Sequence, residues 1–139
     1  MVNYIKTIAY EEGRRPFLYK CSEGKQTIGI GRNIEDRGLS DDEIEYIYRN
    51  DERIAIAGAS QLVKEFEYLA DARKIALVSM VFQMGKPRVS KFKKMIAAID
   101  EGNFSDAAVE MLDSNWHKQT PARAKRHAEM MKTGRMIVS

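Results

Sequence analysis

An apolar segment in the middle of the chain constrains the fold more than any other feature. Between Ala70 and Met84, apolar side chains recur on almost every side of a helical circumference, at Ala72, Ile75, Ala76, Leu77, Val78, Met80, Val81 and Phe82. A helix that is apolar all round is buried by the elements around it. Gly85 and Pro87 follow directly and predict the end of this helix. The segment therefore predicts a central helix inside a larger helical unit.

Helices are also predicted on both sides of this segment, from helical periodicity and from residues typical of helix ends. The predicted ranges are residues 3–12, 41–57, 61–69, 90–100, 105–113 and 121–132. The expected N-caps are Ser90, Ser105 and Thr120, with Pro121 at a first helical position, and the expected helix ends are Gly13, Gly102 and Gly134. Ser40 and Glu43 form a capping box, in which each side chain bonds the other residue's backbone N–H.

Two short strands are predicted before the first long helix. Residues 17–20 and 25–31 flank a polar turn at Glu23 and Gly24. Gly29 and Gly31 lack the third glycine and the following helix of a dinucleotide-binding fingerprint. We therefore interpret these two glycines as positions where the sheet bends or where a ligand approaches the backbone. The predicted fold class is α+β, mostly α.

The composition fits one globular domain and leaves the kind of partner open. The chain has 139 residues, with 23 Lys and Arg against 20 Asp and Glu and a net charge of +3. This weakly basic balance favours an anionic partner such as a nucleic acid, a membrane surface or a bacterial wall, and it fits ordinary solubility charge equally well. A single cysteine excludes an intramolecular disulfide, and the N-terminus lacks the apolar core of a signal peptide. No segment approaches the ~20 apolar residues of a membrane-spanning helix.

The stretch from Glu12 to Arg32 holds the side chains best suited to catalysis. Glu12 ends the first predicted helix, and Cys21 and Thr27 lie on either side of the predicted turn. A helix end followed by a hairpin would place all three around one cleft. There Glu12 can donate a proton, Cys21 can act as base or nucleophile, and Thr27 can hold a water. Each also has a purely structural interpretation, as a solvated surface carboxylate, a small buried thiol and a strand former.

Three sequence blocks, in the same order along the chain, resemble one known family. Glu12 is followed after eight residues by Cys21 and after five more by Thr27, residues 79–85 read SMVFQMG, and Trp116 precedes QTPARAKR at residues 119–126. This pattern resembles the phage lysozymes of the T4 type, in which Asp or Cys stands at the second position of the first block. On these blocks the chain is identified as a member of that family.

The resemblance implies a lysozyme-like fold for the whole chain, residues 1–139, as one domain with a cleft between two lobes. The smaller lobe is expected to span about residues 13–57 and to contain the β-hairpin. The larger, helical lobe is expected to span about residues 58–139 together with helix 3–12. Only residues 32–39 separate the predicted strand from the capping box, where familiar T4-type members carry a longer hairpin and loop.

The resemblance also implies roles for the three catalytic candidates. Glu12 is expected to be the acid that protonates the leaving oxygen, and Thr27 to orient the attacking water. With an ordinary pKa of about 8.5, a thiol is only a few per cent ionised at neutral pH, so Cys21 is a weaker fixed charge than the alternative Asp. Cys21 either positions water or attacks the sugar itself, and the presence of Thr27 favours water positioning.

By the same resemblance, further residues are expected to bind substrate: Glu23, Phe82, Gln83 and Arg123. Arg123 is expected to pair with Glu12. The alternative interpretations make Phe82 a core residue and Arg123 a solvated charge. Trp116 is expected to be structural, since tryptophan is more often part of a core than a platform for a sugar.

The function implied is that of a phage endolysin, a muramidase that hydrolyses the β-1,4 bond between N-acetylmuramic acid and N-acetylglucosamine and thereby lyses the host. Such enzymes need no metal or cofactor, and His117 and His127 lack the companion ligands of a metal site.

The expected enzyme is a monomer that binds no nucleic acid and does not insert stably into a membrane. It is expected to wait in the host cytoplasm until a separate holin-type pore admits it to the periplasm and wall. Two other functions stay open, a lytic transglycosylase and a non-catalytic peptidoglycan-binding relative. Retained Glu12 argues against a decayed binder, and Thr27 favours hydrolysis over transglycosylation.

Overall fold

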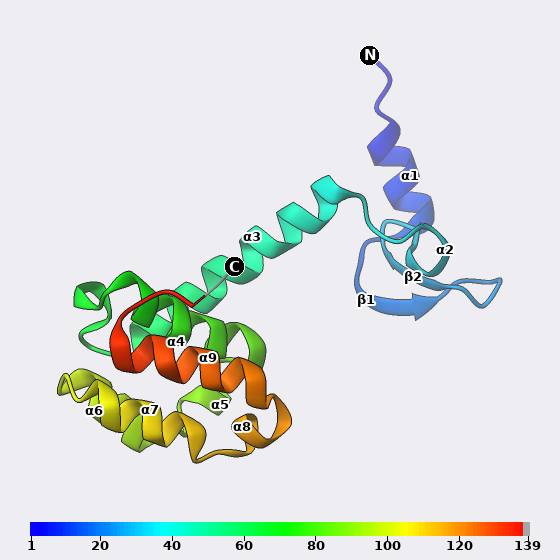
Figure 1. Cartoon of the computed structure of the whole chain (residues 1–139). Coiled ribbons are helices and arrows are strands. Elements are labelled where there is room, and N and C mark those ends of the chain that lie inside the picture. Colours follow the sequence, from blue (N-terminus) through cyan, green and yellow to red (C-terminus); the bar gives the residue numbers. More distant parts are fainter. Residues whose placement is uncertain (138–139) are drawn as a thin grey trace. The chain divides into compact units, whose positions relative to one another are not determined.

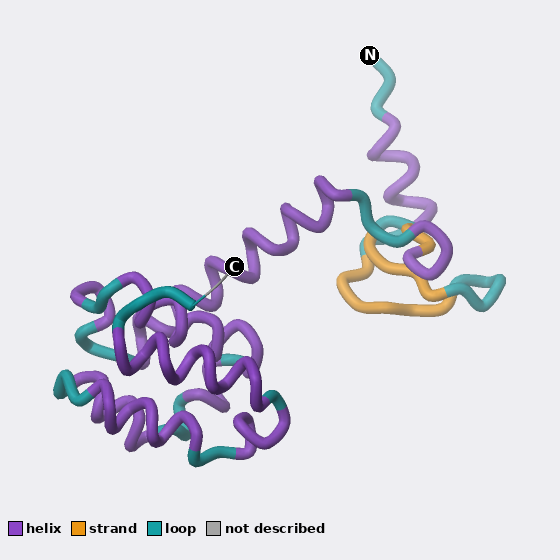
Figure 2. Tube along the Cα trace, viewed as in Figure 1, coloured by secondary structure: helices purple, strands orange, loops and turns teal. Residues whose placement is uncertain are grey.

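The computed structural model describes residues 1–137 as a mostly helical chain with a small sheet near its N-terminus (Figures 1 and 2). The elements are α1 Tyr4–Glu12, β1 Arg15–Lys20, β2 Gln26–Gly29, β3 Arg32–Asn33, α2 Ile34–Arg37, α3 Asp41–Leu62, a 3₁₀ turn at Phe66–Tyr68, α4 Asp71–Met84, α5 Lys86–Val89, α6 Lys93–Asp100, α7 Phe104–Leu112, α8 Asn115–Gln119 and α9 Pro121–Thr133. This confirms the predicted α+β, mostly α fold class.

The chain divides into two compact units, Met1–Ile47 and Tyr48–Ser139. The first unit contains α1, the sheet, α2 and the beginning of α3, and the second contains the rest of α3 and the helices that follow it. The predicted assignment of helix 3–12 to the helical lobe, and the predicted cleft, stay predictions.

The first unit is built from α1 and a three-stranded antiparallel sheet in the order β1-β2-β3. Asn3 caps α1 by accepting a hydrogen bond from the Lys6 N–H, and Gly13 ends it with an N–H bond to the Ala9 carbonyl, as predicted. The hairpin is also confirmed, and Thr27 of β2 lies between Tyr19 of β1 and Asn33 of β3. β3 and α2 were not predicted, because elements this short show no periodicity.

The capping box at the start of α3 forms as predicted. The Ser40 N–H donates to Glu43 Oε1 at 2.8 Å, and the Glu43 N–H donates to Ser40 Oγ at 3.3 Å. Both terminal nitrogens of Arg32, in β3, also donate hydrogen bonds to the Glu43 carboxylate. This guanidinium is the main reason that the pKa of Glu43 falls to about 2, with the Ser40 N–H contributing further. The ion pair therefore ties the end of the sheet to the first turn of α3.

The segment after α3 differs from the prediction. α3 continues to Leu62, beyond its predicted end near residue 57, and the separate helix predicted for residues 61–69 is wrong. A single 3₁₀ turn at Phe66–Tyr68 stands there instead. Val63, Phe66 and Leu69 are all buried. Their three-residue spacing matches a 3₁₀ turn as well as an α-helix, so periodicity could not distinguish the two.

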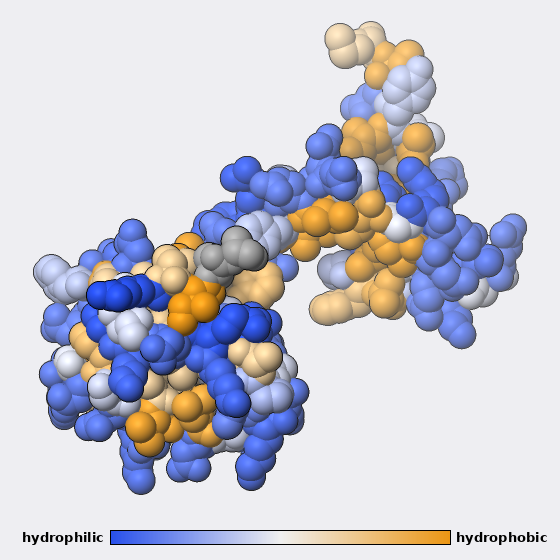
Figure 3. Space-filling view, viewed as in Figure 1, coloured by the Kyte–Doolittle hydropathy of each residue, from blue (hydrophilic) through white to orange (hydrophobic). Residues whose placement is uncertain are grey.

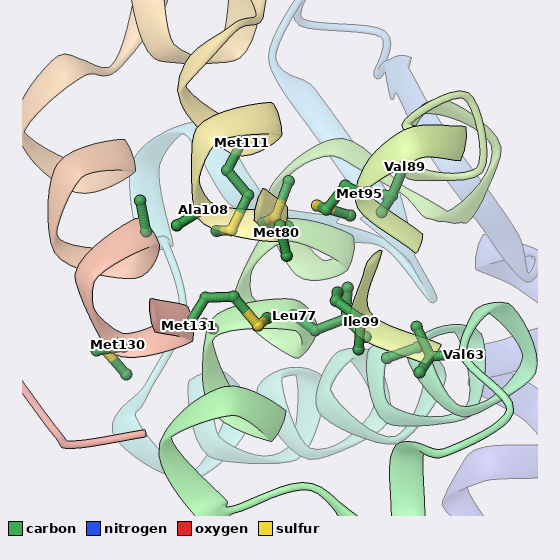
Figure 4. Packing of buried hydrophobic residues seen from close by; sticks show 14 of the residues in the cluster. Val63, Leu77, Met80, Val89, Met95, Ile99, Ala108, Met111, Met130 and Met131 are labelled. Carbon is green, nitrogen blue, oxygen red and sulfur yellow. The ribbon is translucent and has the colours of Figure 1, made fainter. Parts of the chain in front are cut away.

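α4 contributes several buried side chains to the core of the second unit, as its apolar sequence predicted. α9 packs against α4 and α7, and α6 packs against α7. Leu77 and Met80 of α4 are fully buried among aliphatic and methionine side chains, which interleave in Figure 4. α4 is nevertheless not buried all round, because Ile75 and Phe82 are 44% and 45% exposed. One face of the central helix is therefore available to a ligand or another surface.

Several helix ends in the second unit differ from those predicted. Ser90 and Ser105 are not N-caps, because α6 begins after Phe92 and α7 begins after Asn103. Thr120 does precede α9 and Pro121 does open it, but the Thr120 hydroxyl donates to the Trp116 carbonyl instead of capping. The helices α5 and α8 were not predicted, being only four and five residues long.

The visible face of the helical unit is largely hydrophilic. In Figure 3, hydrophilic residues cover most of this face, with apolar areas between them. Among residues 1–137, no helix combines the length and apolar character needed to cross a bilayer.

Candidate active site

Glu12 is the last residue of α1, and a tight helix end fixes its backbone. Gly13 follows at φ +78°, and its N–H closes the last turn of the helix. In the first unit taken alone Glu12 is exposed, and its side chain extends over Gly31, in the turn between β2 and β3. Arg123 belongs to the other unit, so the predicted Glu12–Arg123 pair stays a prediction.

Cys21 lies at the tip of the β1–β2 hairpin, inside its turn. Its N–H donates to the Lys25 carbonyl at 3.0 Å, and its carbonyl accepts from the Gly24 N–H at 2.8 Å. Gly24 has φ +78°, a conformation that glycine adopts without strain. The predicted turn at Glu23 and Gly24 is thus confirmed, and these backbone bonds hold the thiol in a defined place.

The surroundings of Cys21 favour its thiolate. Hydrogen bonding to the backbone of Lys25, and next to that of Glu23, lowers the pKa of the thiol from its ordinary value. The side chain of Thr27 lies within hydrogen-bonding distance of the sulfur, while partial desolvation and the Glu23 carboxylate act against the lowering of this pKa. A sulfur that accepts N–H bonds is better suited to be a base than a free thiol, because those bonds stabilise the charged form.

Thr27 is a buried polar side chain beside Cys21. It is only 3% exposed, and its hydroxyl donates to the Lys25 carbonyl at 2.9 Å. With the proton directed at that carbonyl, the oxygen keeps lone pairs with which to accept a hydrogen bond from water. The structure therefore brings two of the three predicted catalytic residues together at one hairpin. Glu23 lies exposed in the same turn.

A groove of about 640 Å³ in the second unit contains two of the predicted substrate-binding residues. It is lined by Tyr48, Glu52, Ile56, Phe66, Glu67, Lys74, Ile75, Val78, Ser79, Phe82 and Arg123. The Phe82 ring lies 5.8 Å from that of Tyr48, centroid to centroid. The alternative interpretation of Phe82 as a core residue is wrong, since almost half of it is exposed.

Arg123 is anchored on α4. Its Nη2 donates to Ser79 Oγ at 2.7 Å and to the Ser79 carbonyl at 3.3 Å. Arg123 is therefore half-buried and held in place, which does not fit the alternative interpretation of it as a freely solvated charge. Arg123 lines the same groove as Phe82.

Gln83 has a structural contact that the sequence did not indicate. Its side-chain oxygen accepts a hydrogen bond from the Trp116 indole N–H at 2.9 Å. Trp116 is only 3% exposed and belongs to the core, as predicted. Gln83 thus satisfies the one polar atom of a buried indole, and its predicted contact with substrate stays a prediction. Within residues 1–137, no three His, Cys, Asp or Glu side chains are grouped as metal ligands would be.

Comparison with known proteins decides the family. The profile of the family described as phage lysozyme matches residues 9–130. The chain belongs to the phage lysozyme family. It is 34% and 32% identical to probable T4-type lysozymes 2 and 1 of Dictyostelium discoideum, over 96% of each protein. It is also 25% identical, over 93% of its own length and 15% of the other protein, to the peptidoglycan hydrolase gp36 of Pseudomonas phage phiKMV.

This lysozyme is a glycoside hydrolase by its family, and the match includes every candidate site residue from Glu12 to Arg123. The two glycines that the sequence marked as positions of a bend or a close approach lie next to the site. Gly29 ends β2 and Gly31 follows in the β2–β3 turn, and only the folded structure shows that Gly31 lies under Glu12.

Proposed function

We propose that this lysozyme hydrolyses the β-1,4 bond between N-acetylmuramic acid and N-acetylglucosamine in bacterial peptidoglycan. The observation that carries the proposal is the pairing of Cys21, whose pKa is lowered, with the buried Thr27 hydroxyl in the hairpin that follows Glu12. The similarity to T4-type lysozymes and to a protein named as a peptidoglycan hydrolase supports this choice of substrate.

In the proposed reaction Glu12 acts as the general acid. As the glycosidic C–O bond breaks, the leaving sugar oxygen takes the proton of the Glu12 carboxyl group. Its exposed position at the end of α1 leaves this side chain accessible to a bound sugar. After this step Glu12 is a carboxylate, and it takes up a new proton from solvent.

Cys21 and Thr27 deliver the water. Thr27 Oγ1, whose own proton points to the Lys25 carbonyl, accepts a hydrogen bond from one proton of the water. The Cys21 thiolate accepts the other and removes it as the water oxygen attacks the anomeric carbon. The attack comes from the face opposite the leaving group, so the product has inverted configuration. Direct attack by sulfur is the competing route and would retain configuration.

The residues of the second unit, together with Glu23, are proposed to bind the sugar chain. Phe82 presents an exposed aromatic face in a groove, and sugars stack on such faces through their C–H groups. Arg123 is proposed to stabilise the Glu12 carboxylate that forms during the reaction. Gln83 and Glu23 are proposed to donate and accept hydrogen bonds with the acetamido and hydroxyl groups.

In its biological setting the enzyme is proposed to be an endolysin. It would act as a monomer that binds no nucleic acid, stays out of the bilayer, and reaches the periplasm and wall from the host cytoplasm through a holin-type pore. Host lysis would release the phage.

Digestion of purified peptidoglycan, with mass spectrometry of the fragments, tests the proposal. Reducing muramic acid ends are expected, together with their loss in a folded Glu12→Gln variant. Anhydromuramic acid ends would instead identify a transglycosylase, and reducing glucosamine ends would identify a different bond. Binding to the wall without any fragments would show a non-catalytic relative.

A further inference from the structure

Two glycines, one at the end of β2 and one in the turn that follows it, have similar positive φ angles and different surroundings. Gly29 has φ +72° and Gly31 has φ +69°, a region that residues with a side chain rarely adopt. A Cβ atom at Gly29 would have no heavy atom within 4 Å. A Cβ atom at Gly31 would lie 2.8 Å from Glu12 Oε2, 3.0 Å from Glu12 Cδ and 3.1 Å from Glu12 Cγ.

The outer half of the Glu12 side chain therefore occupies the space that a side chain at position 31 would need. Non-bonded carbon and oxygen atoms are most stable about 3.5–4 Å apart, so three contacts this short cannot persist. The carboxylate is the free end of a flexible side chain, whereas position 31 is tied into the sheet by the neighbouring Ile28–Arg32 pair. Relief of the contact would thus move the carboxylate and leave the backbone in place.

We propose that Gly31 is a positioning residue for Glu12. The missing side chain at Gly31 leaves a bare backbone surface on which the Glu12 carboxyl group rests, and this surface determines where the acidic proton is presented. Gly31 does not touch the reacting atoms itself. The catalytic part of this inference rests on the proposed role of Glu12 as general acid.

The expected consequence is a defect in the chemical step. Misplacement of a catalytic group by about 1 Å can cost about 10²-fold in rate. Gly31→Ala is therefore expected to lower kcat about 10²-fold while changing KM little, because the residues proposed to bind the sugar are elsewhere. The melting temperature of Gly31→Ala should fall only by the amount that an alanine at a positive φ angle costs.

Gly29→Ala is the control, since it also places a side chain at a positive φ angle, two residues away, without reaching Glu12. Both variants should lose melting temperature, and kcat should fall far more in Gly31→Ala. If Gly31→Ala does not fold, Gly31→Asn tests the same point. Asparagine tolerates positive φ better than alanine and still carries the Cβ atom.

A second measurement does not depend on activity. The chemical shift of the Glu12 carboxyl carbon, assigned by its loss in Glu12→Gln, can be compared between the two variants by carbon-13 NMR. A change in Gly31→Ala that is absent in Gly29→Ala supports the inference even if the wild type fails to cleave peptidoglycan, which would contradict only the proposed function. Equal kcat losses in both variants, or an unmoved Glu12 signal in Gly31→Ala, would overturn the positioning role.

Discussion

Replacement of Cys21 by Asp is the perturbation that best separates the two mechanisms open to this site. If Cys21 acts as a base on water, the rate depends on the fraction of molecules in which its side chain is ionised. Cys21→Asp should then keep or raise activity at neutral pH, because a carboxylate is fully ionised there. If the sulfur attacks the sugar itself, the exchange replaces the thiolate by an intrinsically weaker nucleophile whose oxygens extend farther from the backbone.

The size of the expected gain in rate follows from the pKa values of a thiol and of a carboxyl group at position 21. A thiol with an ordinary pKa of about 8.5 is about 3% ionised at pH 7 and a carboxylate is almost fully ionised, so the gain cannot exceed about 30-fold. The hydrogen bonds from the Lys25 and Glu23 backbone already lower the pKa of Cys21, which reduces this limit. A carboxylate is also the weaker base once ionised, which reduces it further. We therefore expect a result between no change and a gain well below that limit.

The assay is the initial rate of release of reducing ends from purified peptidoglycan, measured from weakly acidic to weakly alkaline pH. Wild-type activity should fall as the pH drops through the pKa of the Cys21 thiol, and this fall should move to a much lower pH in Cys21→Asp. Cys21→Ala, which has no base, is the control and should be slow at every pH. A retained β product seen by NMR before mutarotation, or a sugar adduct trapped on Cys21, would refute the water-positioning mechanism.

Three further predictions concern Glu12, Glu43 and His127. Glu12→Gln should fold normally and lose about 10²–10⁴-fold in rate, and retention of more than about a tenth of wild-type activity would rule out Glu12 as the acid. The pKa of Glu43 is lowered to about 2, so its pairing with Arg32 stabilises the fold above the ordinary carboxyl pKa and is lost as pH falls toward 2. Glu43→Gln should accordingly melt at a lower temperature than the wild type near neutral pH and converge with it in strong acid, and parallel melting curves at all pH values would contradict this. Burial, with the charge of Arg123 second, lowers the pKa of His127, and the backbone of Arg123 opposes this lowering; the buried Nδ1 of His127 makes no hydrogen bond of good geometry. His127→Leu should therefore stabilise the protein by about 1–3 kcal/mol and remove a loss of stability below the ordinary histidine pKa of about 6.5. His117→Leu is the control, since the Nδ1 of His117 is bonded to the Leu112 carbonyl at 2.8 Å, and it should destabilise.

Features that depend on neighbouring residues in the chain were predictable from the sequence. The Ser40–Glu43 capping box, the end of α1 at Gly13 and the turn at Gly24 are all as predicted. Each is decided by groups only a few residues apart in the chain, so the local sequence contains the information. The central helix was predictable for a related reason, since its many apolar side chains need a core whatever surrounds them.

Other features depend on which surfaces meet in the folded chain. Ile75 and Phe82 look like core residues in the sequence, but the elements packed around α4 leave that face uncovered. The lowered pKa of Cys21 arises from backbone groups brought around its sulfur by the closed hairpin. The support of Glu12 by Gly31 joins a helix end to a turn many residues later, and neither residue indicates the other. The sequence by itself determined the family, the helices with strong end signals and the identity of the catalytic candidates. Exposure, protonation and side-chain position were decided only by the folded structure, because each depends on distances and directions between groups that the sequence alone does not fix.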